Sequence, residues 1–165
     1  MVGAVVLAAG SASRFGAPKQ RLLLPEVLSR IRGVEKVVVV SGAYELEGAV
    51  PCPEWERGPG ASLRCGLAAL GPEVDAAVVV LADGPDLAPA AVERVVAAWR
   101  ETRAPVVAAS YGGVRGHPLV VARSAWDGIP DEGLRAREPL LVPCDDLGSP
   151  GDVDRPDDLP ERLRS

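Results

Sequence analysis

Residues 2–20 read VGAVVLAAGSASRFGAPKQ, and in this stretch a short apolar run passes directly into a loop of small residues. The run lacks a preceding cationic segment and is too short to span a membrane, so it predicts a buried strand rather than a signal peptide. Glycines, serines and two cations, Arg14 and Lys19, follow it. Backbone N–H groups of such a loop can approach phosphate oxygens, so the stretch predicts an anion-binding turn at a strand end.

The spacing of this loop matches neither common phosphate-binding motif. Gly16 is followed by Ala17 and Pro18 before Lys19, which is not the Walker pattern, and the dinucleotide fingerprint G-x-G-x-x-G is also missing. Arg14 offers a planar two-pronged contact and Lys19 a mobile point charge. An ordinary turn with solvated charges is the alternative interpretation.

Other short apolar runs, rich in valine and bounded by Gly, Pro or Asp, predict further strands. The predicted strands are 3–7, 36–40, 76–81, 105–109, 119–122 and 140–143. Helical spacing is clearest over 89–101, where Val92, Val95, Val96 and Trp99 form one apolar stripe. Further helices are expected over 62–70, 24–31 and 157–163.

Strands that alternate with helices predict an α/β fold, and we expect residues 1–165 to form a single domain. The expected architecture is a three-layer α/β/α, Rossmann-like arrangement with a mostly parallel sheet. Ligands of such sheets bind beyond the carboxyl ends of the strands, so the residues just after each strand are the candidates for a site. The stretch 145–160, rich in Asp, Gly and Pro, predicts a solvated loop or a disordered tail.

Composition excludes several classes of partner. The net charge of −5 argues against a nucleic-acid polymer, and no apolar stretch has the length of a membrane span. Cys52, Cys65 and Cys144 are odd in number and lack zinc-type spacing, so we expect buried or incidental free thiols in a reducing compartment, and hence a cytoplasmic protein.

The chain resembles the MobA-like nucleotidyltransferases, and in particular the molybdenum cofactor cytidylyltransferase branch of that family. Its first loop fits the pattern Leu-Ala-Ala-Gly-x-x-x-Arg-x-Gly-x-x-Lys-Gln, and further segments follow in the family's order. The matching segments are 7–20, 53–67, 81–85, 115–118 and 152–159. The resemblance implies a nucleotide-diphospho-sugar transferase type of fold.

The resemblance also implies roles for individual residues. Arg14 and Lys19 would be catalytic, and the acceptor would lie near His117, for which a purely structural role is the alternative. The nucleotide-binding set would be Leu7, Ala8, Ala9, Gly10, Ser11, Gly16, Gly60, Ser62, Arg64 and Asp83.

Asp83 ends the most apolar strand and should therefore point into the crevice as a ligand of Mg²⁺, which takes one or two protein carboxylates with phosphates and waters. A turn or capping carboxylate is the alternative for Asp83. The resemblance implies Asp152 as the second ligand, with Asp154 as the substitute.

These roles predict Mg²⁺-dependent transfer of a nucleoside monophosphate from an NTP to a phosphorylated small molecule, molybdopterin, with release of pyrophosphate. Guanylyl relatives carry glycine at the position of Ala9. The methyl group of Ala9 would narrow the pocket for the base, which favours CTP over GTP. A sugar phosphate or another alcohol phosphate is the alternative acceptor, and a non-catalytic nucleotide-binding regulator is the alternative class. Transient contact with a molybdoenzyme or its chaperone is also expected, without nucleic-acid or membrane partners.

Overall fold

Strand β1 (Val2–Ala8) lies inside the sheet, with β2 on one side and β4 on the other. Within residues 1–9, 19–152 and 156–163, which the computed structural model describes, seven strands form one sheet in the order β3-β2-β1-β4-β6-β5-β7. The other strands are β2 (Lys36–Ser41), β3 (Val50–Pro51), β4 (Ala76–Leu81), β5 (Val106–Tyr111), β6 (Val114–Ala122) and β7 (Leu140–Pro143).

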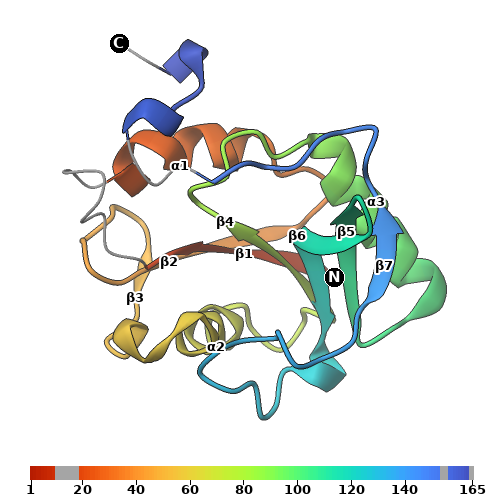
Figure 1. Ribbon diagram of the computed structural model, residues 1–165. Coiled ribbons are helices and arrows are strands. Elements are labelled where there is room, and N and C mark those ends of the chain that lie inside the picture. Colours follow the sequence, from red (N-terminus) through yellow and green to blue (C-terminus); the bar gives the residue numbers. More distant parts are fainter. Residues whose placement is uncertain (10–18, 153–155, 164–165) are drawn as a thin grey trace.

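Helices cover both faces of this sheet, which gives the predicted three layers (Figure 1). The helices are α1 (Lys19–Ser29), α2 (Pro59–Ala69) and α3 (Pro89–Thr102). Helices α1 and α3 pack on one face through a core that includes Val27, Val92 and Val95. Helix α2 packs on the other face through Leu63 and Leu67. Short valine-rich strands buried on both faces are typical of this architecture.

Strand direction is mostly parallel but reverses at β6. The pairs β1·β2, β1·β4, β2·β3 and β5·β7 are parallel, whereas β6 runs antiparallel to both β4 and β5. The register places Val5 beside Val38 of β2 and beside Val79 of β4. Because of the reversal, the beginning of β6 lies at the same edge of the sheet as the ends of β1 and β4.

The predicted strands are confirmed within one or two residues at most ends, except that β6 begins five residues earlier than expected. The very short β3 was not predicted. Helix α1 begins at Lys19, earlier than predicted, and contains Pro25. The expected helix over 157–163 forms instead two separate 3₁₀ turns, Pro156–Asp158 and Glu161–Leu163.

The expectation of three free thiols was wrong for two of the cysteines. Cys52 and Cys65 form a disulfide that ties the segment after β3 to helix α2, whereas Cys144 is free and buried. The spacing of the cysteines along the chain did not predict this disulfide, because the two thiols meet only when β3 and α2 fold against each other. In the described part of the chain, no helix combines the length and the apolar character that crossing a membrane requires.

Gly66 sets how closely α2 approaches the sheet. A Cβ atom at this position would overlap Cγ1 of Val5 and would lie 2.9 Å from Cγ2 of Val40. We therefore expect Gly66→Ala to lower the free energy of unfolding by about 1–3 kcal/mol, because an added methyl group in a packed core forces its neighbours apart. Urea unfolding measures this change. Val5→Ala makes room for the methyl group, so Gly66→Ala should lower the free energy of unfolding by less in that background. An equal decrease in both backgrounds would contradict the packing explanation.

Candidate active site

Three strand ends meet at one edge of the sheet. Leu7 and Leu81 lie at or near the carboxyl ends of the parallel strands β1 and β4, in register with each other. The reversed direction of β6 brings Arg115 and His117 to the same edge. This edge is where ligands of α/β sheets bind, so the topology alone places a candidate site here.

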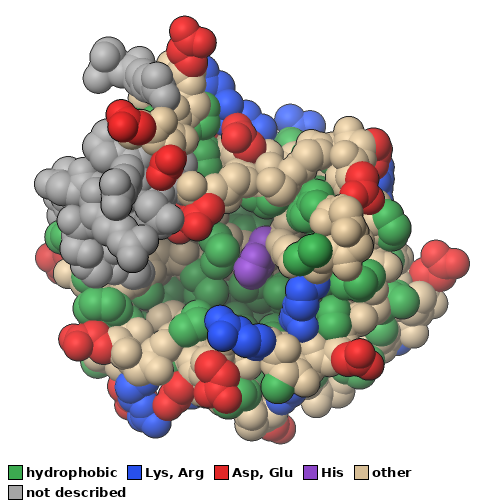
Figure 2. All heavy atoms as spheres, in the orientation of Figure 1, with side chains coloured by type: hydrophobic (Ala, Val, Ile, Leu, Met, Phe, Trp, Pro, Cys, Tyr) green, Lys and Arg blue, Asp and Glu red, His purple; other side chains and the backbone are tan. Residues whose placement is uncertain are grey.

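A cleft opens at this edge and extends to both faces of the sheet. One hollow, of about 430 Å³, is lined by Val80 and Tyr111, and the other, of about 450 Å³, by Leu63 and Leu134. The two hollows share the wall formed by Leu81, Arg115, Gly116 and His117. Figure 2 shows the hollow at the centre of this face, with apolar side chains on its floor and the single histidine in its wall.

The His117 side chain in this wall is uncharged at neutral pH. Burial, reinforced by the charge of Arg115, lowers the pKa of His117 to about 4. The Tyr111 hydroxyl donates a hydrogen bond of 2.7 Å to the His117 carbonyl oxygen and fixes the backbone at this point. At neutral pH the imidazole can therefore donate one hydrogen bond and accept one, and it adds no positive charge to the cleft.

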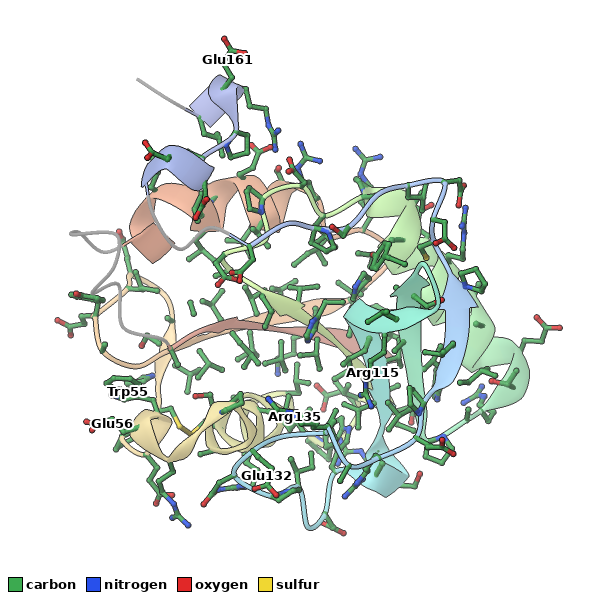
Figure 3. All side chains as sticks on the ribbon, viewed as in Figure 1. Trp55, Glu56, Arg115, Glu132, Arg135 and Glu161 are labelled. Carbon is green, nitrogen blue, oxygen red and sulfur yellow. A yellow bond between two sulfur atoms is a disulfide. The ribbon has the colours of Figure 1, made fainter. Side chains whose placement is uncertain are left out.

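Positive charge at the rim comes instead from Arg115 and Arg135. Figure 3 shows Arg115 on β6 and Arg135 on the segment that passes below α2, both at the same side of the cleft. Arg115 is held by a 2.7 Å hydrogen bond from its Nη1 to the carbonyl oxygen of Arg137. Glu132 lines the same hollow. No local pattern singled out Arg135, because it lies outside any regular element and joins the cleft only through the path of this connection.

Two acidic segments lie side by side at the cleft. Asp83 is the second residue after β4 and is half-buried, and Asp152 is exposed and lines the first hollow together with Gly84. The backbone N–H of Asp86 donates a 2.9 Å hydrogen bond to the carbonyl oxygen of Pro150, and a Cβ atom on Gly84 would lie 2.9 Å from Cβ of Pro150. The structure thus brings together the segments that carry the two predicted metal ligands.

The donor set around this point fits Mg²⁺ or a similar hard cation. In the described residues, no group of three or more His, Cys, Asp or Glu side chains is suited to hold a metal ion. Two carboxylates without a complete protein cage are what Mg²⁺ uses when substrate phosphates and waters fill the rest of its coordination sphere.

Close packing surrounds the end of β1, where the glycine-rich loop begins. Ala8 and Ala9 are buried, and the backbone N–H of Ala43 donates a 3.3 Å hydrogen bond to the Ala9 carbonyl oxygen. A Cβ atom on Gly42 would overlap this same oxygen and would lie 2.6 Å from Cγ of Trp55. The Trp55 ring therefore rests against Gly42 and next to Ala9, where only glycine leaves room for it.

The predicted residues of α2 lie in the first turns of that helix. Gly60 and Ser62 are buried, and the Gly60 N–H donates a 2.8 Å hydrogen bond to the carbonyl oxygen of Asp131. The guanidinium of Arg64 binds Asp131 Oδ1 at 2.7 Å and the Ile129 carbonyl oxygen at 2.7 Å. In this structure Arg64 thus anchors the connection that carries Arg135, and its contact with a nucleotide stays a prediction.

Several predicted phosphate contacts lie outside the described residues. These are Gly10, Ser11, Arg14 and Gly16, and the alternative metal ligand Asp154. For Lys19 the structure describes the backbone, which forms the first residue of α1. The roles of all these residues stay predictions.

Comparisons with known proteins identify the family of this chain. The sequence profile of the MobA-like NTP transferase domain matches residues 4–138. The chain belongs to the MobA-like NTP transferase family. The matched residues include most of β1, all of β4 and β6, and the connection with Arg135. The segment with Asp152 lies beyond them. No curated protein matches this MobA-like chain at a significant level.

Solved structures show the same fold over nearly the whole chain. Rv0371c from Mycobacterium tuberculosis H37Rv has 26% identity and a TM-score of 0.74, over 95% of this chain and 94% of that one. The Rv0371c complex with manganese from the same organism has 25% identity, a TM-score of 0.66 and coverage of 95% of both chains. Molybdopterin-guanine dinucleotide biosynthesis protein A from Archaeoglobus fulgidus has 18% identity and a TM-score of 0.73, over 98% of this chain and 96% of that one.

The lowered pKa of His117 predicts a specific dependence of stability on pH. Between pH 6.5 and about 4, the unfolded chain binds a proton at this position and the folded chain does not. The free energy of unfolding should therefore decrease as the pH falls through this window, by about 2 kcal/mol from His117. Urea unfolding at several pH values measures this, and the decrease should be smaller by that amount in His117→Gln and His117→Asn. Equal pH slopes in wild type and both variants would contradict a neutral buried imidazole.

Proposed function

We propose that this MobA-like NTP transferase transfers a nucleoside monophosphate from CTP, in preference to GTP, to the terminal phosphate of molybdopterin. An oxygen of the acceptor phosphate forms a bond to the α-phosphorus, the bond from that phosphorus to the β-phosphate bridge breaks, and pyrophosphate leaves. We also propose that residues 1–165 act as one catalytic domain in the cytoplasm and that the product passes to a molybdoenzyme or its chaperone through a transient contact.

One observation carries this proposal: two acidic segments, an arginine-rimmed apolar hollow and the start of the glycine-rich loop converge at a single edge of the sheet. Asp152 and Arg115 line the first hollow, next to the segment with Asp83, and Arg115 and Arg135 line the second. Transfer between two anions requires groups that bring them together and offset their charge, and these groups are distributed around one cleft.

Asp83 and Asp152 would hold a magnesium ion in this site. When bound, the ion would offset the charge of the α- and β-phosphates and so favour attack on the α-phosphorus. The manganese complex of Rv0371c supports a divalent ion in a relative with the same fold. Asp83 is positioned by the end of β4, and Asp152 is positioned by the contact between its segment and Asp86.

The NTP would lie along the end of β1. We assign its phosphates to the backbone of the loop with Gly10 and Gly16 and to the side chains of Arg14 and Lys19. The base would lie near Ala9, whose surroundings are crowded by Gly42 and Trp55. A narrow space suits a pyrimidine better than a purine, which supports CTP.

The acceptor would occupy the apolar hollow. Leu63 and Leu134 offer an apolar surface for a flat ring system, and the neutral imidazole of His117 can exchange hydrogen bonds with its polar edge. Arg115 and Arg135 would bind the acceptor phosphate at the rim. Because a phosphate nucleophile is already ionised, the reaction requires no basic histidine, which agrees with the lowered pKa of His117.

Incubation with each NTP, Mg²⁺ and a choice of acceptors, with pyrophosphate as the readout, tests this function. Release of pyrophosphate with CTP and molybdopterin supports the proposal. Release only with a sugar phosphate or another alcohol phosphate would favour the alternative acceptors, and tight CTP binding without turnover would favour a regulator.

Asp83→Asn should reduce Mg²⁺-dependent turnover by at least about 100-fold, because an amide replaces a charged metal ligand at the reacting phosphate. Initial rates of pyrophosphate release measure the loss, and circular dichroism checks that the variant is folded. Asp127→Asn, an exposed aspartate outside the cleft, is the control and should keep wild-type activity. An unimpaired Asp83→Asn enzyme would remove Asp83 from the mechanism.

Arg135→Ala should raise the KM for the acceptor by about 10-fold and leave the KM for the NTP within about twofold, because it removes one charged contact at the acceptor side of the cleft. Steady-state kinetics with each substrate varied in turn measure the two constants. Arg100→Ala, on α3 and outside the cleft lining, is the matched control. A change confined to the KM for the NTP would place Arg135 at the nucleotide instead.

A further inference from the structure

Two arginines from distant parts of the chain converge on Glu26 of α1. Arg30 binds Glu26 Oε1 through Nε at 3.0 Å and Nη2 at 2.8 Å, and Arg162 binds the same oxygen through Nε at 3.3 Å. Hydrogen bonds from Arg30 and then Arg162 lower the pKa of Glu26. The carboxylate is therefore charged at neutral pH and joins the C-terminal segment to α1.

The same two arginines also hold the loop that follows Asp83. Arg162 donates through Nη2 to the Pro85 carbonyl oxygen at 2.9 Å and through Nη1 to Asp86 Oδ1 at 2.9 Å. Arg30 donates through Nη1 to the Leu87 carbonyl oxygen at 3.2 Å. Two backbone carbonyls and one carboxylate within four residues of Asp83 are thus bound by guanidinium groups.

The segment that carries Asp152 rests on this loop as well. The Asp86 N–H binds the Pro150 carbonyl oxygen at 2.9 Å, and a Cβ atom on Gly151 would lie 3.4 Å from Asp86 Oδ2. Asp86 is therefore in contact with Arg162 through its side chain and with the Asp152 segment through its backbone. One set of contacts therefore connects the two segments that carry Asp83 and Asp152.

Apolar contacts bring Arg162 to this place. Leu159, which precedes the second 3₁₀ turn, and the partly buried Leu163, the last residue of that turn, pack against Leu23 of α1. Figure 1 shows the C-terminal turns lying across α1, and Figure 3 shows Glu161 on their outer side. Because α1 begins at Lys19, the same contacts join the helix that follows the predicted phosphate loop to the loop after Asp83.

We propose that Arg162, together with Glu26 and Arg30, is a positioning residue of the metal site that fixes the loop after Asp83 relative to the Asp152 segment and to α1. We name these three residues the Arg162 clamp. The clamp rests on the proposed function, because it acts through Asp83 and Asp152 as metal ligands. Exposed ion pairs add little to global stability, whereas a small displacement of a group at a reacting centre costs a large factor in rate.

Arg94 provides a matched control for Arg162. Its guanidinium binds both carboxylate oxygens of Asp146, at 2.8 and 3.1 Å, and the Pro143 carbonyl oxygen at 3.0 Å. Its side chain has 37% exposure, against 42% for Arg162. Both arginines thus bind an aspartate and a proline carbonyl at the surface, but Arg94 joins α3 to the end of β7 rather than to the loop after Asp83.

Binding of Mn²⁺ in the presence of CTP, measured by electron paramagnetic resonance, tests the clamp without any need for turnover. Arg162→Ala should weaken Mn²⁺ binding by about 5- to 20-fold, whereas Arg94→Ala should bind Mn²⁺ as wild type does. In the activity assay, Arg162→Ala should need more metal for half-maximal rate, while the KM for CTP at saturating metal stays within about twofold. Glu26→Gln and Arg162→Lys, which keep the size of the side chains, should show the same shift to a smaller extent.

These measurements distinguish a failure of the clamp proposal from a failure of the proposed metal site. Equal Mn²⁺ affinity in Arg162→Ala and Arg94→Ala would overturn the clamp, provided that Asp83→Asn has lost Mn²⁺ binding. Wild-type Mn²⁺ affinity in Asp83→Asn would overturn the proposed metal site, and the clamp with it. If Arg162→Ala does not fold, the same comparison is made with Glu26→Gln and Arg162→Lys, and wild-type Mn²⁺ affinity in both would overturn the clamp.

Discussion

The hydrogen bonding of β1 to two parallel neighbours positions the elements of the candidate site. Both sides of β1 are occupied, by β2 and by β4. The chain that follows β1 therefore cannot pair with it in a hairpin, and it leaves the sheet at the carboxyl edge. The neighbouring β4 ends at the same edge and delivers Asp83 there. A single pattern of backbone pairing thus decides where the glycine-rich loop and the acidic residue lie relative to each other.

The reversal of β6 adds the third component of the site. Had β6 been parallel to β4, Arg115 and His117 would lie at the opposite edge, far from the end of β1. Antiparallel pairing places them in the wall between two hollows, and burial there keeps the imidazole neutral. The chain, although acidic overall, thus presents Arg115 and Arg135 in the lining of the cleft.

Ion pairs and hydrogen bonds at the surface fix the segments that lie outside the sheet. Guanidinium groups join the loop after Asp83 to α1 and to the C-terminal turns through carbonyl and carboxylate oxygens, and a backbone hydrogen bond joins the same loop to the segment before Asp152. Such contacts are weak in water one at a time, but several of them converge on Glu26 and Asp86. Their convergence gives an irregular region a defined geometry next to the cleft.

Local periodicity was enough to predict the strands and the main helices, from valine-rich runs and the stripe on 89–101, and to place Asp83 near a strand end. The family also followed from local motifs. Contacts between distant parts of the chain set the direction of β6, the pairing of Cys52 with Cys65, the position of Arg135 at the cleft and the convergence of two arginines on Glu26. These features join residues far apart in the chain, and no local pattern encodes which distant partner a strand, thiol or guanidinium will meet.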